Sequence, residues 1–147
     1  MDKLELHAAT LERIQAAKNP NTSLVALCEL AKDDYWVRLE VARNPNISLG
    51  ILREMATDEA YGVRRNVVRN PKTPENTIRE LALDESDHVR WAVAENTMVS
   101  SNLLVMLFEY EKNLNYTVPE IIVALYKNTN SPLVIKKVIE TLYGEWL

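Results

Sequence analysis

The chain has 147 residues and a formal net charge of -4, from 17 Lys and Arg against 21 Asp and Glu, which is not the composition of a domain that binds nucleic acid through bulk positive charge. Hydrophobic residues make up 47%, enough for a core, and three glycines are few for an all-β domain with many tight turns. The single cysteine, Cys28, excludes an intramolecular disulfide and any metal or iron–sulfur site built from cysteines alone. The N-terminus lacks the apolar segment of a signal peptide, and the longest apolar run, at 103–108, is too short to span a bilayer, so we expect a cytoplasmic protein.

A motif built on asparagine recurs along the chain, and we call its asparagines the anchor asparagines: Asn19, Asn44, Asn70, Asn96 and Asn128. It reads ERIQAAKNPNTS, VRLEVARNPNIS, VRRNVVRNPKTP and VRWAVAENTMVS, and ends in a degraded copy, IIVALYKNTNSP. A second motif lies between these copies and reads LVALCELAKD, LGILREMATD, NTIRELALD and, more loosely, NLLVMLFEY. The period is 25–26 residues until the last step, which lengthens to 32. The chain is therefore predicted to hold five repeats, at 1–23, 24–48, 49–74, 75–100 and 101–132, within a single domain spanning 1–147.

Each repeat is predicted to contain two short helices. The first should end at the asparagine, because the residue before a proline is pushed out of the α region. The second should begin after an N-cap, for which the candidates are Thr22 or Ser23, Ser48, Thr73 and Ser100. Two full helices hardly fit into 25 residues, so one helix per repeat should have only two turns or be a 3₁₀ helix. Because so short a unit cannot bury its own apolar face, the repeats should stack into an all-α solenoid.

The last segment, residues 133–147, follows the fifth repeat as a further amphipathic helix. Leu133, Val134, Val138, Ile139 and Leu142 are apolar, whereas Lys136, Lys137 and Glu140 are polar. One interpretation is a cap that covers the last repeat. In the other, an apolar strip made of Leu133, Val138, Leu142 and Trp146 stays open, and the protein is a weak homodimer through this helix rather than a monomer.

The line Val-Arg-x-x-Val-Ala-x-Asn-Pro resembles the leucine-rich repeat variant family. The resemblance is strong over 13–100, fades over 101–132 and does not extend to 133–147. It implies a right-handed superhelix of alternating α and 3₁₀ helices. The chain is also similar to HEAT repeats in the acidic residue six positions before the motif arginine, at Asp58 and Asp84. The iron–sulfur cluster described in the family needs an N-terminal cysteine cluster, which this chain lacks, so no cofactor is expected.

One column of arginines falls inside the apolar arc of the first helices. It contains Arg13, Arg38, Arg64 and Arg90. A guanidinium in that position should be partly buried and must be paired. We predict a structural ladder in which the acceptors are the carboxylates upstream, such as Asp58 and Asp84, or carbonyls at the end of a neighbouring helix. The alternative is a row of arginines that bind phosphate.

The candidate binding surface consists of basic and aromatic residues outside that ladder. Arg43 and Arg69 precede two of the anchor asparagines, Arg53 and Arg79 occupy equivalent positions on second helices, and Arg65 has no equivalent in other repeats and should be exposed. Glu54 and Glu80 directly follow Arg53 and Arg79, so an ordinary solvated surface is the alternative to a basic binding surface at these positions. Trp36 and Trp91 flank ladder arginines and could either stack on a partner or pack between repeats.

No catalytic constellation is evident. His7 and His88 lack a Cys or Ser partner at a recognisable spacing, and a Gly-rich phosphate loop is missing. We therefore expect a non-catalytic scaffold that binds a protein. The alternative is a HEAT-like nucleic-acid-binding protein, related at the extreme to enzymes that excise alkylated bases, with Trp36, Trp91 and Asp87 as the pocket.

Overall fold

The computed structural model describes residues 3–114 and 116–147, and these form helices joined by turns, with no strand among them. The first helix of each repeat has nine residues or more, and most second helices have seven. The α-helices are α1 (Lys3–Lys18), α2 (Leu24–Leu30), α3 (Tyr35–Arg43), α4 (Leu49–Met55), α5 (Tyr61–Arg69), α6 (Glu75–Leu81), α7 (Asp87–Glu95), α8 (Ser101–Lys112), α9 (Pro119–Lys127) and α10 (Leu133–Tyr143), followed by the 3₁₀ helix η1 (Gly144–Trp146). The predicted all-α repeat architecture is confirmed.

The chain forms two compact units, of which the first ends at Thr73 and the second begins at Pro74. The first unit contains α1 to α5 and the second contains α6 to α10 with η1. The boundary falls where the third repeat ends. The prediction of a single right-handed domain over 1–147 depends on how the two units are joined, and it stays a prediction.

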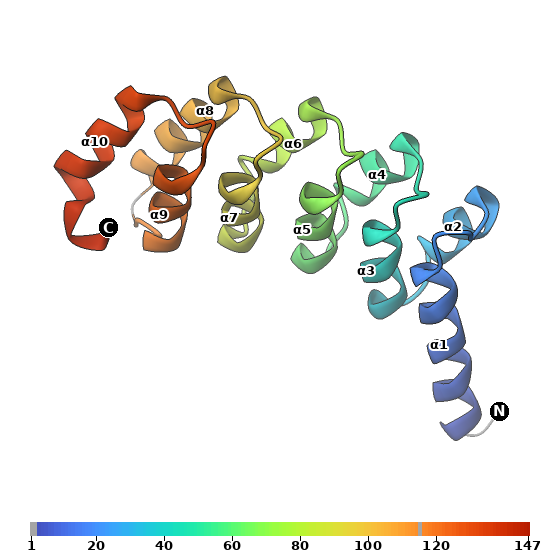
Figure 1. The fold of residues 1–147 in the computed structure, drawn as a ribbon. Helices are drawn as coiled ribbons and strands as arrows, with labels where there is room; N and C mark the ends of the chain where they lie inside the picture. The colour runs from blue at the N-terminus through green and yellow to red at the C-terminus, as the bar shows by residue number, and fades with distance from the viewer. Residues whose placement is uncertain (1–2, 115) are drawn as a thin grey trace. The chain divides into compact units, whose positions relative to one another are not determined.

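In the first unit, the first helices of successive repeats lie side by side. Helix α3 packs against both α1 and α5, while α2 and α4 form a second row behind them (Figure 1). The core between the rows is made of side chains with no exposed surface, such as Leu27, Val37, Leu52 and Val63. These residues come from both rows, so each repeat buries its apolar face against its neighbour.

The second unit repeats this arrangement with longer helices at its end. Helix α7 packs against α9, and both contact α8, while α10 packs against α9 (Figure 1). The apolar run of residues 103–108 supplies Leu103, Leu104, Leu107 and Phe108 to the core.

The second helices α2, α4 and α6 are two-turn α-helices rather than 3₁₀ helices. Their first turns already carry bonds of α type, such as the one from the Leu27 N–H to the Ser23 carbonyl at 2.9 Å. Ser23 and Ser48 cap two of them by accepting a hydrogen bond from the backbone three residues on, and Ser100 caps α8 in the same way.

Two of the proposed N-caps, Thr22 and Thr73, are wrong. The cap of α6 is Pro74, which has no side chain able to accept a bond, and the cap of α2 is Ser23. The Thr22 and Thr73 hydroxyls instead donate to the carbonyls of Ala16 and Val67, 2.6 and 2.5 Å away. Both threonines lie one residue before the N-cap of the second helix. Their hydroxyls therefore bond to carbonyls near the end of the first helix instead.

The anchor asparagines connect neighbouring repeats inside each unit, a role that the sequence did not reveal. The Asn70 side-chain amide donates to the carbonyls of Ala42 and Asn44 in the preceding repeat, at 2.9 and 3.2 Å. Its side-chain oxygen accepts from the Lys72 N–H at 3.0 Å. Asn44 in the first unit and Asn128 in the second make the same set of bonds. All three are buried, and each satisfies carbonyls that the end of a helix leaves without a partner.

Candidate binding surfaces

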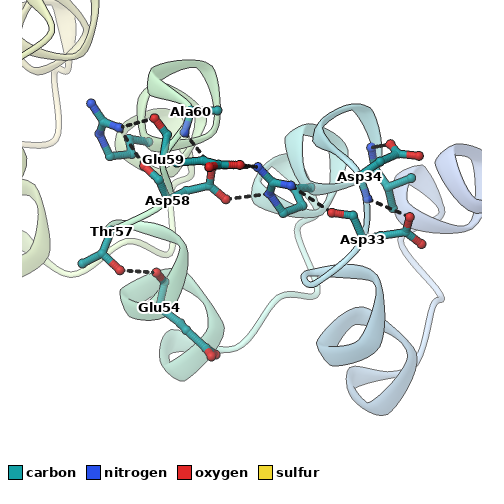
Figure 2. A network of polar contacts seen from close by, with 10 residues as sticks. Asp33, Asp34, Glu54, Thr57, Asp58, Glu59 and Ala60 are labelled. Carbon is teal, nitrogen blue, oxygen red and sulfur yellow. Dashed lines mark hydrogen bonds and ion pairs between the residues drawn. The ribbon is translucent and has the colours of Figure 1, made fainter.

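The arginine column is built into the framework, as the contacts of Arg38 illustrate. Its acceptors Asp33 and Asp58 belong to the network of polar contacts in Figure 2. The Arg38 guanidinium lies 2.7 Å from the carboxylate of Asp58 and donates to the Asp33 carbonyl at 2.9 Å. Asp58 also accepts from the Ala60 N–H at 2.9 Å, which fixes the turn that carries it. The hydrogen bond to Asp58 raises the pKa of Arg38, against a smaller opposing effect of burial. Arg13 is paired in the same way with Asp33, at 2.8 Å.

The carboxylate partners lie downstream of these arginines, not upstream as expected. The upstream turn contributes backbone carbonyls: Arg64 donates to those of Asp58 and Glu59 at 2.6 and 3.1 Å. Arg90 donates to the carbonyls of Asp84 and Glu85 at 2.8 and 3.1 Å. The reason is geometric, because the carbonyls of that turn point toward the guanidinium of the helix that follows, while the Asp58 carboxylate reaches the preceding repeat. Arg64 and Arg90 are both buried.

Glu111 is a residue that sequence reasoning missed. In the second unit it takes the place of the turn aspartate and pairs with Arg90 at 2.5 Å, from within α8 rather than from a turn. The side chains are 1% and 0% exposed. Burial lowers the pKa of Arg90, but the interactions with Glu111 and Tyr116 outweigh it and the net effect is a raised pKa. Each arginine of the column, on α1, α3, α5 and α7, therefore has a carboxylate or a backbone carbonyl as a partner.

The other predicted basic residues are distributed over different helices. Arg43 and Arg69 line a small hollow of about 130 Å³ between α3 and α5, in the first unit. Arg43 is also paired with Glu40 at 3.1 Å. Arg53 is exposed on α4, in the other row of the same unit. Arg65, which we expected to be exposed, is half-buried, since an arginine stem can cover apolar surface.

In the second unit, Arg79 is exposed on α6 and lies 3.4 Å from Glu75. Neither residue lines the hollows that carry Trp91. Trp36 belongs to the first unit, where it is 60% exposed and meets Tyr35 edge to face.

One hollow lies between α7 and α9, in the second unit. Its volume is about 430 Å³, and its lining includes Trp91 and Glu95 from α7 and Glu120 and Lys127 from α9. A second hollow of about 290 Å³ adjoins it and shares Trp91 and Glu120. Asp87 and His88 complete this second hollow. We call the two together the α7–α9 cleft.

The cleft brings together two of the three residues proposed for a base-excision pocket. Asp87 and Trp91 line the same hollow, whereas Trp36 belongs to the other unit. Among the described residues there is no group of three His, Cys, Asp or Glu side chains that could hold a metal ion. None of the helices formed by residues 3–114 and 116–147 is long and apolar enough to cross a membrane.

The stacked helix pairs, with asparagine and arginine bonds between repeats, define an all-α helical repeat protein. Residues 35–60 match the family model described as leucine rich repeat variant, and this span covers α3, α4 and the turn that leads into α5. Residues 35–60 are therefore similar to the repeat of that family, in agreement with the resemblance of the Val-Arg-x-x-Val-Ala-x-Asn-Pro line. Searches of curated proteins and of solved structures gave no match.

Proposed function

We propose that the protein is a non-catalytic scaffold that binds another protein through exposed side chains of its first helices. The observation that carries this proposal is that the repeated polar side chains bond inside the units, whereas other side chains of the same helices face outward. The asparagines Asn44, Asn70 and Asn128 and the arginines Arg38 and Arg90 have their hydrogen-bond or ion-pair partners inside their own units. Trp36 and the α7–α9 cleft remain on the outside of the first helices, where a partner could reach them. Helical repeats of this kind offer extended surfaces to macromolecules.

To test the proposal, a partner is captured on the intact chain from an extract treated with nuclease. The captured partner is then purified, and its affinity for the intact chain is measured by calorimetry. Trp36→Ser should weaken that binding, because aromatic anchors carry much of the energy of protein interfaces. Val25→Ser is the matched control, since Val25 is 76% exposed on α2, in the other row of the same unit. A partner whose affinity responds only to Val25→Ser would place the interface elsewhere and contradict the proposal.

Nucleic-acid binding is the second candidate, and the hollow between Arg43 and Arg69 is the observation that favours it. Its small volume and the pairing of Arg43 with Glu40 weigh against it. A duplex oligonucleotide titrated at several salt concentrations discriminates the two. Nucleic-acid binding requires a steep linear fall of log K with log salt, from the release of counterions, and Arg69→Gln should reduce that slope.

A further inference from the structure

The two units differ in charge. Residues 1–73 contain 11 Lys and Arg and 10 Asp and Glu, a net charge of +1, whereas residues 74–147 contain 6 and 11, a net charge of -5. The hollows on the first helices follow this difference. The hollow between α3 and α5 is lined by two arginines, and the α7–α9 cleft is lined by three carboxylates against one lysine.

The carboxylates of the cleft flank an indole ring. Asp87, Trp91 and Glu95 are spaced by four residues along α7, so they lie on one side of the helix with the tryptophan in the middle. Glu120, in the first turn of α9, lines both hollows together with Trp91. It is exposed and forms no ion pair with any residue that the structure describes.

An indole face with carboxylates beside it attracts a cation. A cation over tryptophan is stabilised by the quadrupole of the ring, and a nearby carboxylate adds a charge-assisted hydrogen bond. A guanidinium suits both contacts better than an ammonium, because it is planar, stacks on aromatic rings and donates in a fork that matches a carboxylate. The volume of about 430 Å³ is in the range of sites that take a ligand of several heavy atoms.

We infer that the α7–α9 cleft binds a basic peptide segment of the partner protein, with an arginine side chain stacked on Trp91 and paired with Glu120. This inference rests on the proposed function, for which it specifies the chemistry of the partner. Lys127 stands at the end of the cleft that is lined by Asn128 and Thr129, away from Asp87 and His88. The arginine therefore enters at the shared Trp91 and Glu120 position, and a run of consecutive basic residues would meet Lys127.

The experiment is a titration of the intact chain with a fluorescein-labelled peptide of alternating Arg and Gly, followed by fluorescence anisotropy at about 0.1 M salt, where the Debye length is about 10 Å. A peptide with citrulline in place of arginine is the neutral comparison, and a Lys–Gly peptide tests the cation. The arginine peptide should bind most tightly and the citrulline peptide least. Glu120→Gln should weaken binding of the arginine peptide about threefold to tenfold.

Glu109→Gln is the matched control, because it removes the same charge from an exposed position on α8 in the same unit. It should change the affinity by less than about twofold, as expected for a charge outside the site. Equal effects of the two substitutions would mean attraction to the overall negative charge and would overturn the inference. So would citrulline and arginine peptides that bind alike, or no binding at all. If the arginine peptide fails while the purified partner still binds, the inference alone is lost and the scaffold function stands.

Discussion

Arg90 and Glu111 form an ion pair inside the second unit, 2.5 Å apart, with both side chains almost completely removed from solvent. The Arg90 guanidinium also lies 5.7 Å from the centre of the Tyr110 ring. Because this charge has no access to water, its stability in the fold depends on the carboxylate opposite. The pair connects α7 to α8, and α7 carries Trp91, so the ion pair holds one wall of the cleft in place.

Glu111→Gln should lower the free energy of unfolding by about 3–5 kcal/mol, because it leaves a buried guanidinium without its counter-charge. Urea denaturation followed by circular dichroism measures the change. Glu109→Gln, two residues earlier on the same helix, removes an exposed carboxylate and should cost less than about 0.5 kcal/mol. Similar losses in the two variants would show that the Arg90 charge is satisfied without Glu111.

Arg64→Ala should destabilise the first unit by about 3 kcal/mol, since it strands the carbonyls of Asp58 and Glu59 that accept from the buried guanidinium. Arg53→Ala is the control in the same unit. Its side chain is exposed on α4, and removal should change stability by less than about 0.5 kcal/mol. The midpoint of thermal unfolding of the two variants gives the comparison, and a larger shift for Arg53→Ala would refute a structural role of Arg64.

Asn70→Ala should cost about 2–4 kcal/mol, because the carbonyls of Ala42 and Asn44 both lose a donor and the Lys72 N–H loses an acceptor. Asn76→Ala is the comparison, since Asn76 is exposed on α6 and alanine favours a helix. Hydrogen exchange offers a second measurement. The amide of Lys72 should lose protection in Asn70→Ala and keep it in Asn76→Ala.

The helices could be predicted because each repeat marks its own ends. The first helix ends before an asparagine in every repeat, and a proline follows that asparagine in the first three. A serine caps the second helix at Ser23, Ser48 and Ser100. Helical geometry places the motif arginines in the apolar arc, and Arg64 and Arg90 are buried while Arg13 and Arg38 are half-buried. These are local properties, and a single repeat contains all the information they need.

Partners between repeats were harder to predict, because a periodic sequence does not say which neighbour a side chain reaches. The sequence predicts only that a helix ends at Asn70, whereas the side-chain amide of this residue donates to the preceding repeat. The carboxylates were expected upstream, whereas Arg38 reaches Asp58 twenty residues later. That spacing is a signal that could have been used, since Arg13 and Asp33 share it and Arg90 with Glu111 differs by one residue. The cleft was missed because it needs α7 and α9 together, which are separated by the long α8.

The last helix, α10, has one face in the core and another in solvent. Ile135 and Ile139 are buried, while Leu133, Val134 and Leu142 are 57–68% exposed. Both interpretations of this segment thus have residues that fit them: the isoleucines fit a cap, and Leu133 and Leu142 fit an open strip. The other two residues predicted for the strip, Val138 and Trp146, are half-buried, and Val134 is exposed in addition. The variant Leu133→Gln, Val134→Thr, Leu142→Gln should therefore leave the melting temperature nearly unchanged, because surface substitutions cost little. If the strip joins two copies, this variant should sediment as a monomer at concentrations where the intact chain dimerises.

Ile139→Ser should instead lower the free energy of unfolding by about 3 kcal/mol, because it removes buried apolar surface and places a hydroxyl in the core. A triple variant that unfolds as readily as Ile139→Ser would show that the exposed residues are part of the core, and a monomeric intact chain at all concentrations would rule out self-association through α10.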